Sequence, residues 1–241
     1  MQIRLSELLK KMLITYVVVY VIQVFSQHFL GNFFNQWFAL TPSSTVHGMI
    51  WQLFSYSFLH ADVMHLVFNM MVLVFVGGEI EAIWGRLRFL QFYSFCILFV
   101  GLVYFLFQMV FSVSNSPLMG ASGGLYGLLM AYAILFPERE LLFMMMFPLK
   151  SKQFVMIISA IEFLQLASNP NSGGGLGAIA HLSGLGAGWL FLWLQAKGIK
   201  MDFNRSSSGA APTKKRSSHL KLVPDRKKDE EGNGKGPKTW H

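Results

Sequence analysis

Two long stretches without a charged residue set the pattern of this sequence. Residues 13–59 and residues 89–137 contain no Asp, Glu, Lys or Arg. Each stretch is longer than the roughly 20 apolar residues that cross a bilayer as a helix. A polar turn at residues 112–117 divides the second stretch, which therefore predicts two helices. With the remaining apolar runs we expect six membrane-spanning helices, at residues 13–30, 61–76, 89–110, 121–135, 153–167 and 176–196.

The positive charges fall on one side of these six helices. Of the 20 Lys and Arg residues, three precede the first predicted helix, two separate the second and third, three separate the fourth and fifth, and twelve follow the sixth. Cytoplasmic loops are enriched in Lys and Arg, so both ends of the chain are expected in the cytoplasm. The sequence thus predicts an all-α polytopic membrane protein with a cytoplasmic segment at 1–12, a six-helix domain at 13–197 and a disordered basic tail at 198–241.

The amino-acid composition agrees with a location in the membrane and limits the kinds of molecule that the chain is expected to bind. Hydrophobic residues make up 53% of the chain and charged residues only 13%, against about 25% charged residues in ordinary soluble domains. The net charge of +8 comes largely from the tail. The basic side chains of the tail are expected to face solvent or anionic lipid headgroups. We expect no nucleic-acid partner. The one cysteine, Cys96, excludes an intrachain disulfide.

Two segments between the predicted helices are less regular. The first outer loop, from Gly31 to about Ser57, is uncharged and rich in aromatic residues, which is typical of a segment lying in the membrane interface. The apolar run at residues 140–148 ends in a proline. It is either an interfacial piece on the inner side or the first turn of a longer fifth helix, and the sequence leaves both readings open.

Candidate chemistry begins at the start of the fourth predicted helix, which opens with Gly120-Ala121-Ser122-Gly123-Gly124. Three further polar residues lie near the outer ends of other helices: His181 on the sixth, and His65 and Asn69 on the second. At 1.5 Å per residue, the four groups lie within about 5–12 Å of the outer helix ends. Strongly polar residues inside a membrane are costly and by default indicate function.

The residue types at this level fit acyl transfer. A serine hydroxyl becomes a nucleophile when a histidine nitrogen takes its proton, which gives Ser122 and His181 these two roles. Tyr126 follows Ser122 by one helical turn on the same face and is placed to orient the imidazole. His65 and Asn69 share one helix face and can donate hydrogen bonds to an oxyanion, as can the amide of Ser122.

Small residues allow the fourth and sixth helices to meet closely, with Gly120 beside the serine and Gly184 after the histidine. No Asp stands where a third catalytic partner would, so the sequence predicts a dyad rather than a triad. Glu162, the one charged residue of the fifth predicted helix, has no assigned role. Glu81 is expected to tie the inner end of the second helix to the loop that follows.

No metal and no cofactor are expected. His60, Asp62 and His65 form a short His/Asp cluster, but two histidines five residues apart on a helix point about 140° away from each other. His60 is expected instead to support the outer end of the second helix by hydrogen bonding.

These motifs together resemble the rhomboid family of intramembrane serine proteases. The resemblance rests on Gly120-Ala121-Ser122-Gly123 with Tyr126, on Ala180-His181-Leu182-Ser183-Gly184, and on His65-Leu66-Val67-Phe68-Asn69. It implies that Ser122 is the nucleophile, His181 the base, and His65 and Asn69 part of the oxyanion site. It further implies that the substrate is a helix of another membrane protein, cut near its outer end. The segment from Gln153, with the loop Ser168–Gly175, would then be the gate and cap. Many members carry Trp-Arg in the first outer loop where this chain has Trp51-Gln52, which leaves the anchoring of that loop open.

Three other readings differ in what they require. A soluble hydrolase also presents a serine in a Gly-x-Ser-x-Gly turn, but it needs a strand before the helix, and none is predicted. An inactive rhomboid-like protein that binds membrane clients would share the fold, yet such proteins usually lack the serine or the histidine. A channel or transporter would show repeat signals or several midplane charges, which the sequence lacks. We expect a bacterial inner-membrane protein whose active site opens to the extracytoplasmic side; the oligomeric state stays open.

Overall fold

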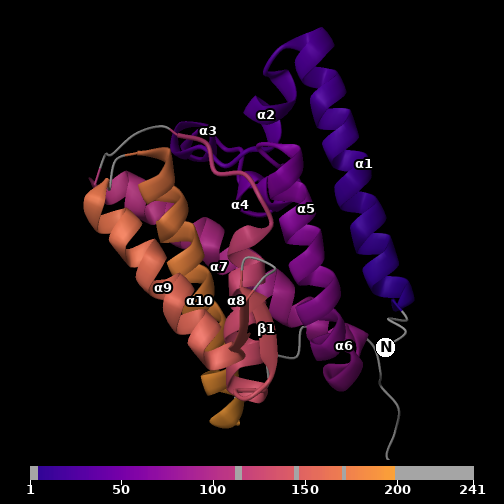
Figure 1. Cartoon of the computed structure of the whole chain (residues 1–241). Coiled ribbons are helices and arrows are strands. Elements are labelled where there is room, and N and C mark those ends of the chain that lie inside the picture. Colours follow the sequence, from indigo (N-terminus) through magenta and orange to yellow (C-terminus); the bar gives the residue numbers. More distant parts are fainter. Residues whose placement is uncertain (1–4, 112–115, 144–146, 170–171, 199–241) are drawn as a thin grey trace, which may run out of the picture. The chain divides into compact units, whose positions relative to one another are not determined.

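The structure is a computed structural model, and it describes residues 5–111, 116–143, 147–169 and 172–198. Figure 1 shows the order of its elements along the chain. They are α1 (Glu7–Leu30), α2 (Phe33–Phe38), α3 (Pro42–Val46), α4 (Gln52–Ser55), η1 (Tyr56–Phe58), α5 (Val63–Val72), η2 (Leu73–Gly77), α6 (Gly78–Trp84), α7 (Arg86–Phe111), α8 (Ser122–Leu135), β1 (Glu140–Phe143), β2 (Phe147–Lys150), α9 (Ser151–Ser168) and α10 (Gly173–Ala196). The predicted tail, apart from Gly198, lies outside the described residues.

A helix occurs at each of the six places where the sequence predicts one. Four of them are long and apolar enough to cross a membrane: α1, the continuous helix Val63–Trp84 that combines α5, η2 and α6, α7, and α10. Helix α8 is apolar but shorter, and α9 is not among the helices that are long and apolar enough to cross a membrane. The protein is therefore a largely helical, multi-pass membrane protein.

Helix α1 begins six residues before the predicted start because Ser6 caps it. The Ser6 hydroxyl oxygen accepts a hydrogen bond from the amide of Leu9, and its proton is donated to the carboxylate of Glu81, 2.5 Å away. The sequence predicts that Glu81 bonds to the loop after the second helix, and this prediction is wrong because its side-chain partner is Ser6. This buried carboxylate on α6 ties the second span to the start of α1 rather than to the following loop.

The prediction of an all-α chain is wrong near residues 140–148, where the structure has two short β-strands. Strands β1 and β2 pair antiparallel, with Glu140 opposite Lys150 and Leu141 opposite Leu149. A longer fifth helix is ruled out because Pro148 lacks an amide proton and cannot sit in a helix interior. The hairpin closes where the amide of Ser151 donates to the carbonyl of Arg139, and α9 starts at that same residue.

Helix α8 packs against α7, α9 and α10 (Figure 1), and glycines set the distances. A Cβ atom on Gly184 of α10 would lie 2.1 Å from the carbonyl oxygen of Gly123, and one on Gly127 would lie 2.6 Å from the Cys96 Sγ atom of α7. Contacts this short leave no room for any side chain. Close approach through glycine is how membrane helices pack tightly, and it fixes α8 between α7 and α10.

Gln52 answers the question of how the first outer loop is anchored. Its side chain is fully buried. The Gln52 Oε1 atom accepts from the amide of Thr41 at 3.1 Å, and the Nε2 atom donates to the carbonyl of Gln36 at 2.9 Å. The neutral amide thus holds α2 and the start of α3 to α4.

Candidate active site

The segment that leads into Ser122 is held on both sides before α8 begins. Leu118 forms an antiparallel bridge with Leu40, through amide-to-carbonyl hydrogen bonds of 2.9 and 3.1 Å. Two residues later the amide of Gly120 donates to the carbonyl of Tyr56 at 3.0 Å. These hydrogen bonds attach the segment Leu118–Gly120 to the loop between α1 and α5, and so they fix the position of Ser122 at the start of α8.

Gly120 has two reasons to be glycine. Its φ of +123° is a conformation that side chains rarely adopt, and a Cβ atom would lie 2.6 Å from the Cε1 atom of His65. The His65 ring of α5 therefore lies directly against the backbone two residues before Ser122. This places a histidine of the second span beside the start of α8.

Ser122 and His181 are in hydrogen-bond contact. The distance from the Ser122 Oγ atom to the His181 Nε2 atom is 2.9 Å. The two residues come from α8 and α10, whose close crossing at Gly123 and Gly184 brings the side chains together. Both side chains are partly exposed, the histidine by 25%, so the pair is not sealed inside the bundle.

Tyr126 lies flat against the imidazole. The ring centroids of Tyr126 and His181 are 4.2 Å apart and the two planes differ by only 5°. A parallel stack of this kind restricts rotation of the imidazole about its χ2 bond, because the tyrosine occupies the space the turned ring would need. Tyr126 thus stands where an orienting residue is expected.

The histidine has a third partner that the sequence did not assign. The Glu162 Oε1 atom of α9 lies 2.8 Å from the His181 Nδ1 atom and accepts the Tyr126 hydroxyl at 2.5 Å. The sequence predicts no Asp in a third-partner position, and the carboxylate found beside His181 belongs to a glutamate instead. Glu162 carried a usable signal, because it lies about 9 Å from the C-terminal end of α9 at 1.5 Å per residue. His181 lies at a similar distance, about 12 Å, from the N-terminal end of α10.

Asn69 and His65 lie on α5, a helix that contacts α8. Asn69 is buried, and its Nδ2 atom has no hydrogen-bond partner among the described residues. Buried polar groups are normally paired, so an unpaired donor here is notable. The amide of Ser122 also belongs to the first turn of α8, whose amides have no partner within the helix.

His60 differs from its predicted place. It precedes α5 rather than lying on it, so the predicted 140° separation does not apply, and its ring centroid is 5.3 Å from that of His65. Its backbone exchanges two hydrogen bonds with the side chain of Gln23, of 2.9 and 3.0 Å. His60 therefore links this loop to α1. Within the described residues there is no group of three or more His, Cys, Asp and Glu side chains able to hold a metal ion.

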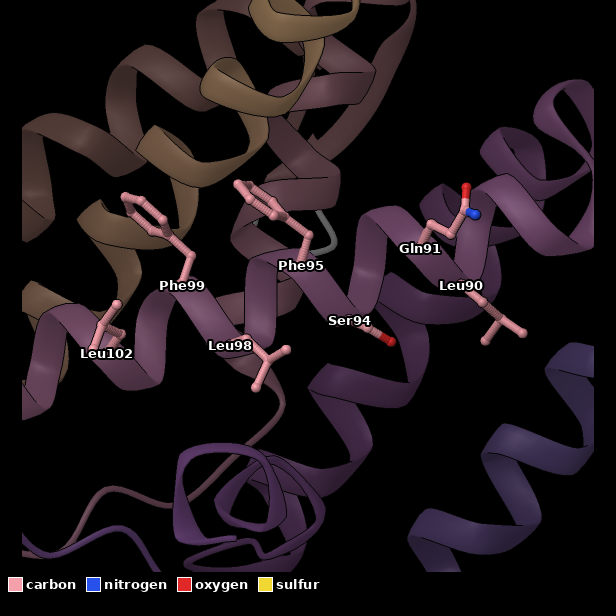
Figure 2. A pocket seen from close by; sticks show the side chains of 7 residues that line it. All are labelled: Leu90, Gln91, Ser94, Phe95, Leu98, Phe99 and Leu102. Atoms are coloured by element: carbon pink, nitrogen blue, oxygen red, sulfur yellow. The ribbon is translucent and has the colours of Figure 1, made fainter. Parts of the chain in front are cut away.

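A pocket of about 500 Å³ lies elsewhere on the molecule. Figure 2 shows that its lining side chains all come from one helix, α7. They are Leu90, Gln91, Ser94, Phe95, Leu98, Phe99 and Leu102. The opposite side of α7 contacts the glycines of α8, through Tyr93, Cys96, Ile97 and Val100. The pocket has no titratable group and does not include Ser122 or His181, so it is not where the polar residues converge.

Comparison with known proteins places the chain in a family. Residues 47–198 match the rhomboid domain. The Bacillus subtilis protein named "Putative rhomboid protease YdcA" is 31% identical over 156 residues, which are 63% of this chain and 71% of that protein. RHOMBOID-like protein 1 of Arabidopsis thaliana is 35% identical over 38% of this chain, and the mitochondrial Rhomboid protein 1 of Saccharomyces cerevisiae is 25% identical over 64% of it. The matched parts are only 22% and 44% of these two proteins. The domain match covers more than half of the chain and contains the Ser122–His181 pair, and the chain belongs to the rhomboid family of membrane proteases.

Proposed function

We propose that this protein is an intramembrane serine endopeptidase that cuts other membrane proteins near the outer end of a transmembrane helix. The observation that carries the proposal is the 2.9 Å contact between the Ser122 Oγ atom and the His181 Nε2 atom. A hydroxyl and a histidine at this distance are the minimum for nucleophilic catalysis. Family membership supports the same chemistry, whereas the inactive alternative gains no support from a chain that keeps both residues.

The reaction divides into two acyl transfers. The Ser122 Oγ atom attacks the carbonyl carbon of the scissile bond while its proton passes to the His181 Nε2 atom. The tetrahedral intermediate collapses, the C–N bond breaks, and the proton passes from the Nε2 atom to the departing amine. A water molecule then attacks the carbonyl carbon of the acyl-enzyme and gives a proton to the His181 Nε2 atom. The second tetrahedral intermediate collapses, the bond from carbon to the Ser122 Oγ atom breaks, and Oγ takes the proton back from His181. The product leaves as a carboxylic acid, which ionises in water.

His65, Asn69 and the amide of Ser122 are proposed as the oxyanion donors. The unpaired Asn69 Nδ2 atom supports this, because a donor aimed at charge that develops only in the transition state has no partner beforehand. The contact of the His65 ring with Gly120 supports it too, since Gly120 lies two residues from the nucleophile.

The orientation of the protein follows from its basic residues. With six spans and both ends in the cytoplasm, α8 and α10 run inward from the outer side. His181 then lies about 12 Å along α10 from Gly173, at 1.5 Å per residue, and Ser122 begins α8. The reaction would take place shallowly, on the extracytoplasmic side of a bacterial inner membrane, where water can reach it.

A comparison of released fragments tests the proposed function. Membranes that contain the wild-type protein and membranes that contain Ser122→Ala are compared by mass spectrometry of newly formed peptide ends. The wild-type protein should produce new ends within a few residues of the outer ends of transmembrane helices, and Ser122→Ala should produce none of them. Cuts in soluble domains, or the same cuts by both proteins, would contradict the proposal.

The oxyanion donors should give graded losses. Removing one donor typically lowers turnover by about 10²–10³-fold, and a backbone amide remains after either change. His65→Ala and Asn69→Ala should therefore lower kcat by that order and leave KM largely unchanged, as measured with a reporter membrane helix. His47→Ala, a change in the exposed first loop, serves as the matched control. If both variants turn over at the wild-type rate, the oxyanion donors have been assigned to the wrong residues.

A further inference from the structure

Glu162 is an unusual residue for its location. It is the only acidic residue of α9, it is just 8% exposed, and its neighbours along the helix, Ile161 and Phe163, are apolar and outward-facing. An ionised carboxylate in such a place is costly unless it is paired and hydrogen-bonded. Both of its described partners, His181 and Tyr126, belong to the candidate active site. The burial of Glu162 is thus compensated by the reaction machinery.

We infer that Glu162 is a positioning residue that acts through His181, so that Ser122, His181 and Glu162 work as a Ser–His–Glu triad built from three different helices. The inference rests on the proposed protease function and adds a member to its machinery. Glu162 does not touch the reacting atoms; it holds the base that does.

The first role of Glu162 is to select the protonation state of the imidazole. An ionised carboxylate is only an acceptor, so the 2.8 Å contact requires the His181 Nδ1 atom to carry the proton. The Nε2 atom is then left with its lone pair, 2.9 Å from the Ser122 hydroxyl. That is the form able to accept the serine proton. The opposite form, with the proton on Nε2, would donate to the serine and could not act as its base.

The second role is electrostatic. When His181 takes the serine proton it becomes a cation, and the Glu162 anion beside its Nδ1 atom stabilises that cation in a setting of low dielectric. The proton stays on the imidazole, and the carboxylate stays ionised throughout. The Tyr126 hydroxyl, bound to the same Oε1 atom, keeps this carboxylate oxygen in place while the tyrosine ring holds the imidazole from below.

Glu162→Gln is the deciding substitution, because it keeps the shape of the side chain and removes the charge. We expect kcat on a reporter membrane helix to fall by on the order of 10²-fold or more, with KM within about twofold of the wild-type value. Glu138→Gln is the matched control. Glu138 lies on the surface outside the spans, where hydrogen bonds from Lys150 and Lys152 hold its pKa well below the usual range, and its loss should leave kcat unchanged.

The split between kcat and KM separates this role from a purely structural one. The described partners of Glu162 are His181 and Tyr126, so loss of positioning should lower kcat and leave KM near the wild-type value. A variant that was merely less stable would show a lower melting temperature, and its loss of rate would follow the fraction of folded protein.

A measurement on the wild-type protein keeps the inference testable if Glu162→Gln fails to fold. Nuclear magnetic resonance of ¹⁵N-histidine-labelled protein should show the neutral His181 ring protonated at Nδ1 and unprotonated at Nε2. The opposite form would overturn the inference, and so would a folded Glu162→Gln with wild-type kcat. In either case an inactive Ser122→Ala leaves the proposed function standing, whereas a folded Ser122→Ala that still cleaves overturns that function itself.

Discussion

Ser122→Ala and His181→Ala should each lower cleavage of a reporter membrane helix to background, a loss of at least about 10⁴-fold, in protein that stays folded and inserted. The size follows from the role of the pair: neither the nucleophile nor its base can be replaced by water at this site. The double variant should lose no more than either single one, because the two residues act as a unit. Initial rates with purified protein in lipid vesicles measure all three.

Ser159→Ala is the matched control for this prediction. Ser159 lies on α9 and donates to the carbonyl of Val155 one turn earlier, so its loss should leave both the fold and cleavage unchanged. Each variant is checked for its melting temperature before its rate is compared. If folded Ser122→Ala retained substantial cleavage, the serine mechanism would be wrong.

The sequence predicts how far along its helix each polar residue lies, but it largely does not predict the direction in which the side chain points. Charge-free runs give the spans, and 1.5 Å per residue gives the level of each residue along them, which is how Ser122, His181, His65 and Asn69 could be grouped. Tyr126 follows Ser122 by one turn, and the structure stacks it on His181. In each of these cases the spacing along one helix carries the information.

Contacts between helices account for what the sequence left out. Glu162 bonds to His181 across the gap from α9 to α10, and Glu81 bonds to Ser6 across 75 residues of chain. Neither partner follows from local spacing, because it depends on which helices become neighbours and how each is rotated. The hairpin of β1 and β2 is a different case, since a short apolar run does not distinguish strand from helix by its periodicity.

Gly184→Ala should be the most damaging of the conservative glycine substitutions. The added Cβ atom would lie 2.1 Å from the carbonyl oxygen of Gly123, which is backbone and cannot turn aside. Helix α10 must therefore move away from α8. Overpacking of this kind costs about 1–3 kcal/mol of folding free energy, so the melting temperature should fall measurably in a thermal unfolding experiment.

The same displacement should reach the chemistry. Gly123 follows Ser122 directly, and His181 lies less than one turn before Gly184 on α10. A separation of α8 from α10 thus lengthens the 2.9 Å contact between the nucleophile and its base, and a misplacement of about 1 Å can cost on the order of 10² in rate.

Gly186→Ala is the matched control. It lies on the same helix with nothing within 4 Å of its added Cβ atom, and alanine is the better helix former by up to about 1 kcal/mol. Gly186→Ala should therefore cleave at the wild-type rate and have an equal or higher melting temperature. Gly184→Ala should have both a lower cleavage rate and a lower melting temperature. Equal behaviour of the two variants would mean that the glycine crossing does not hold Ser122 and His181 together.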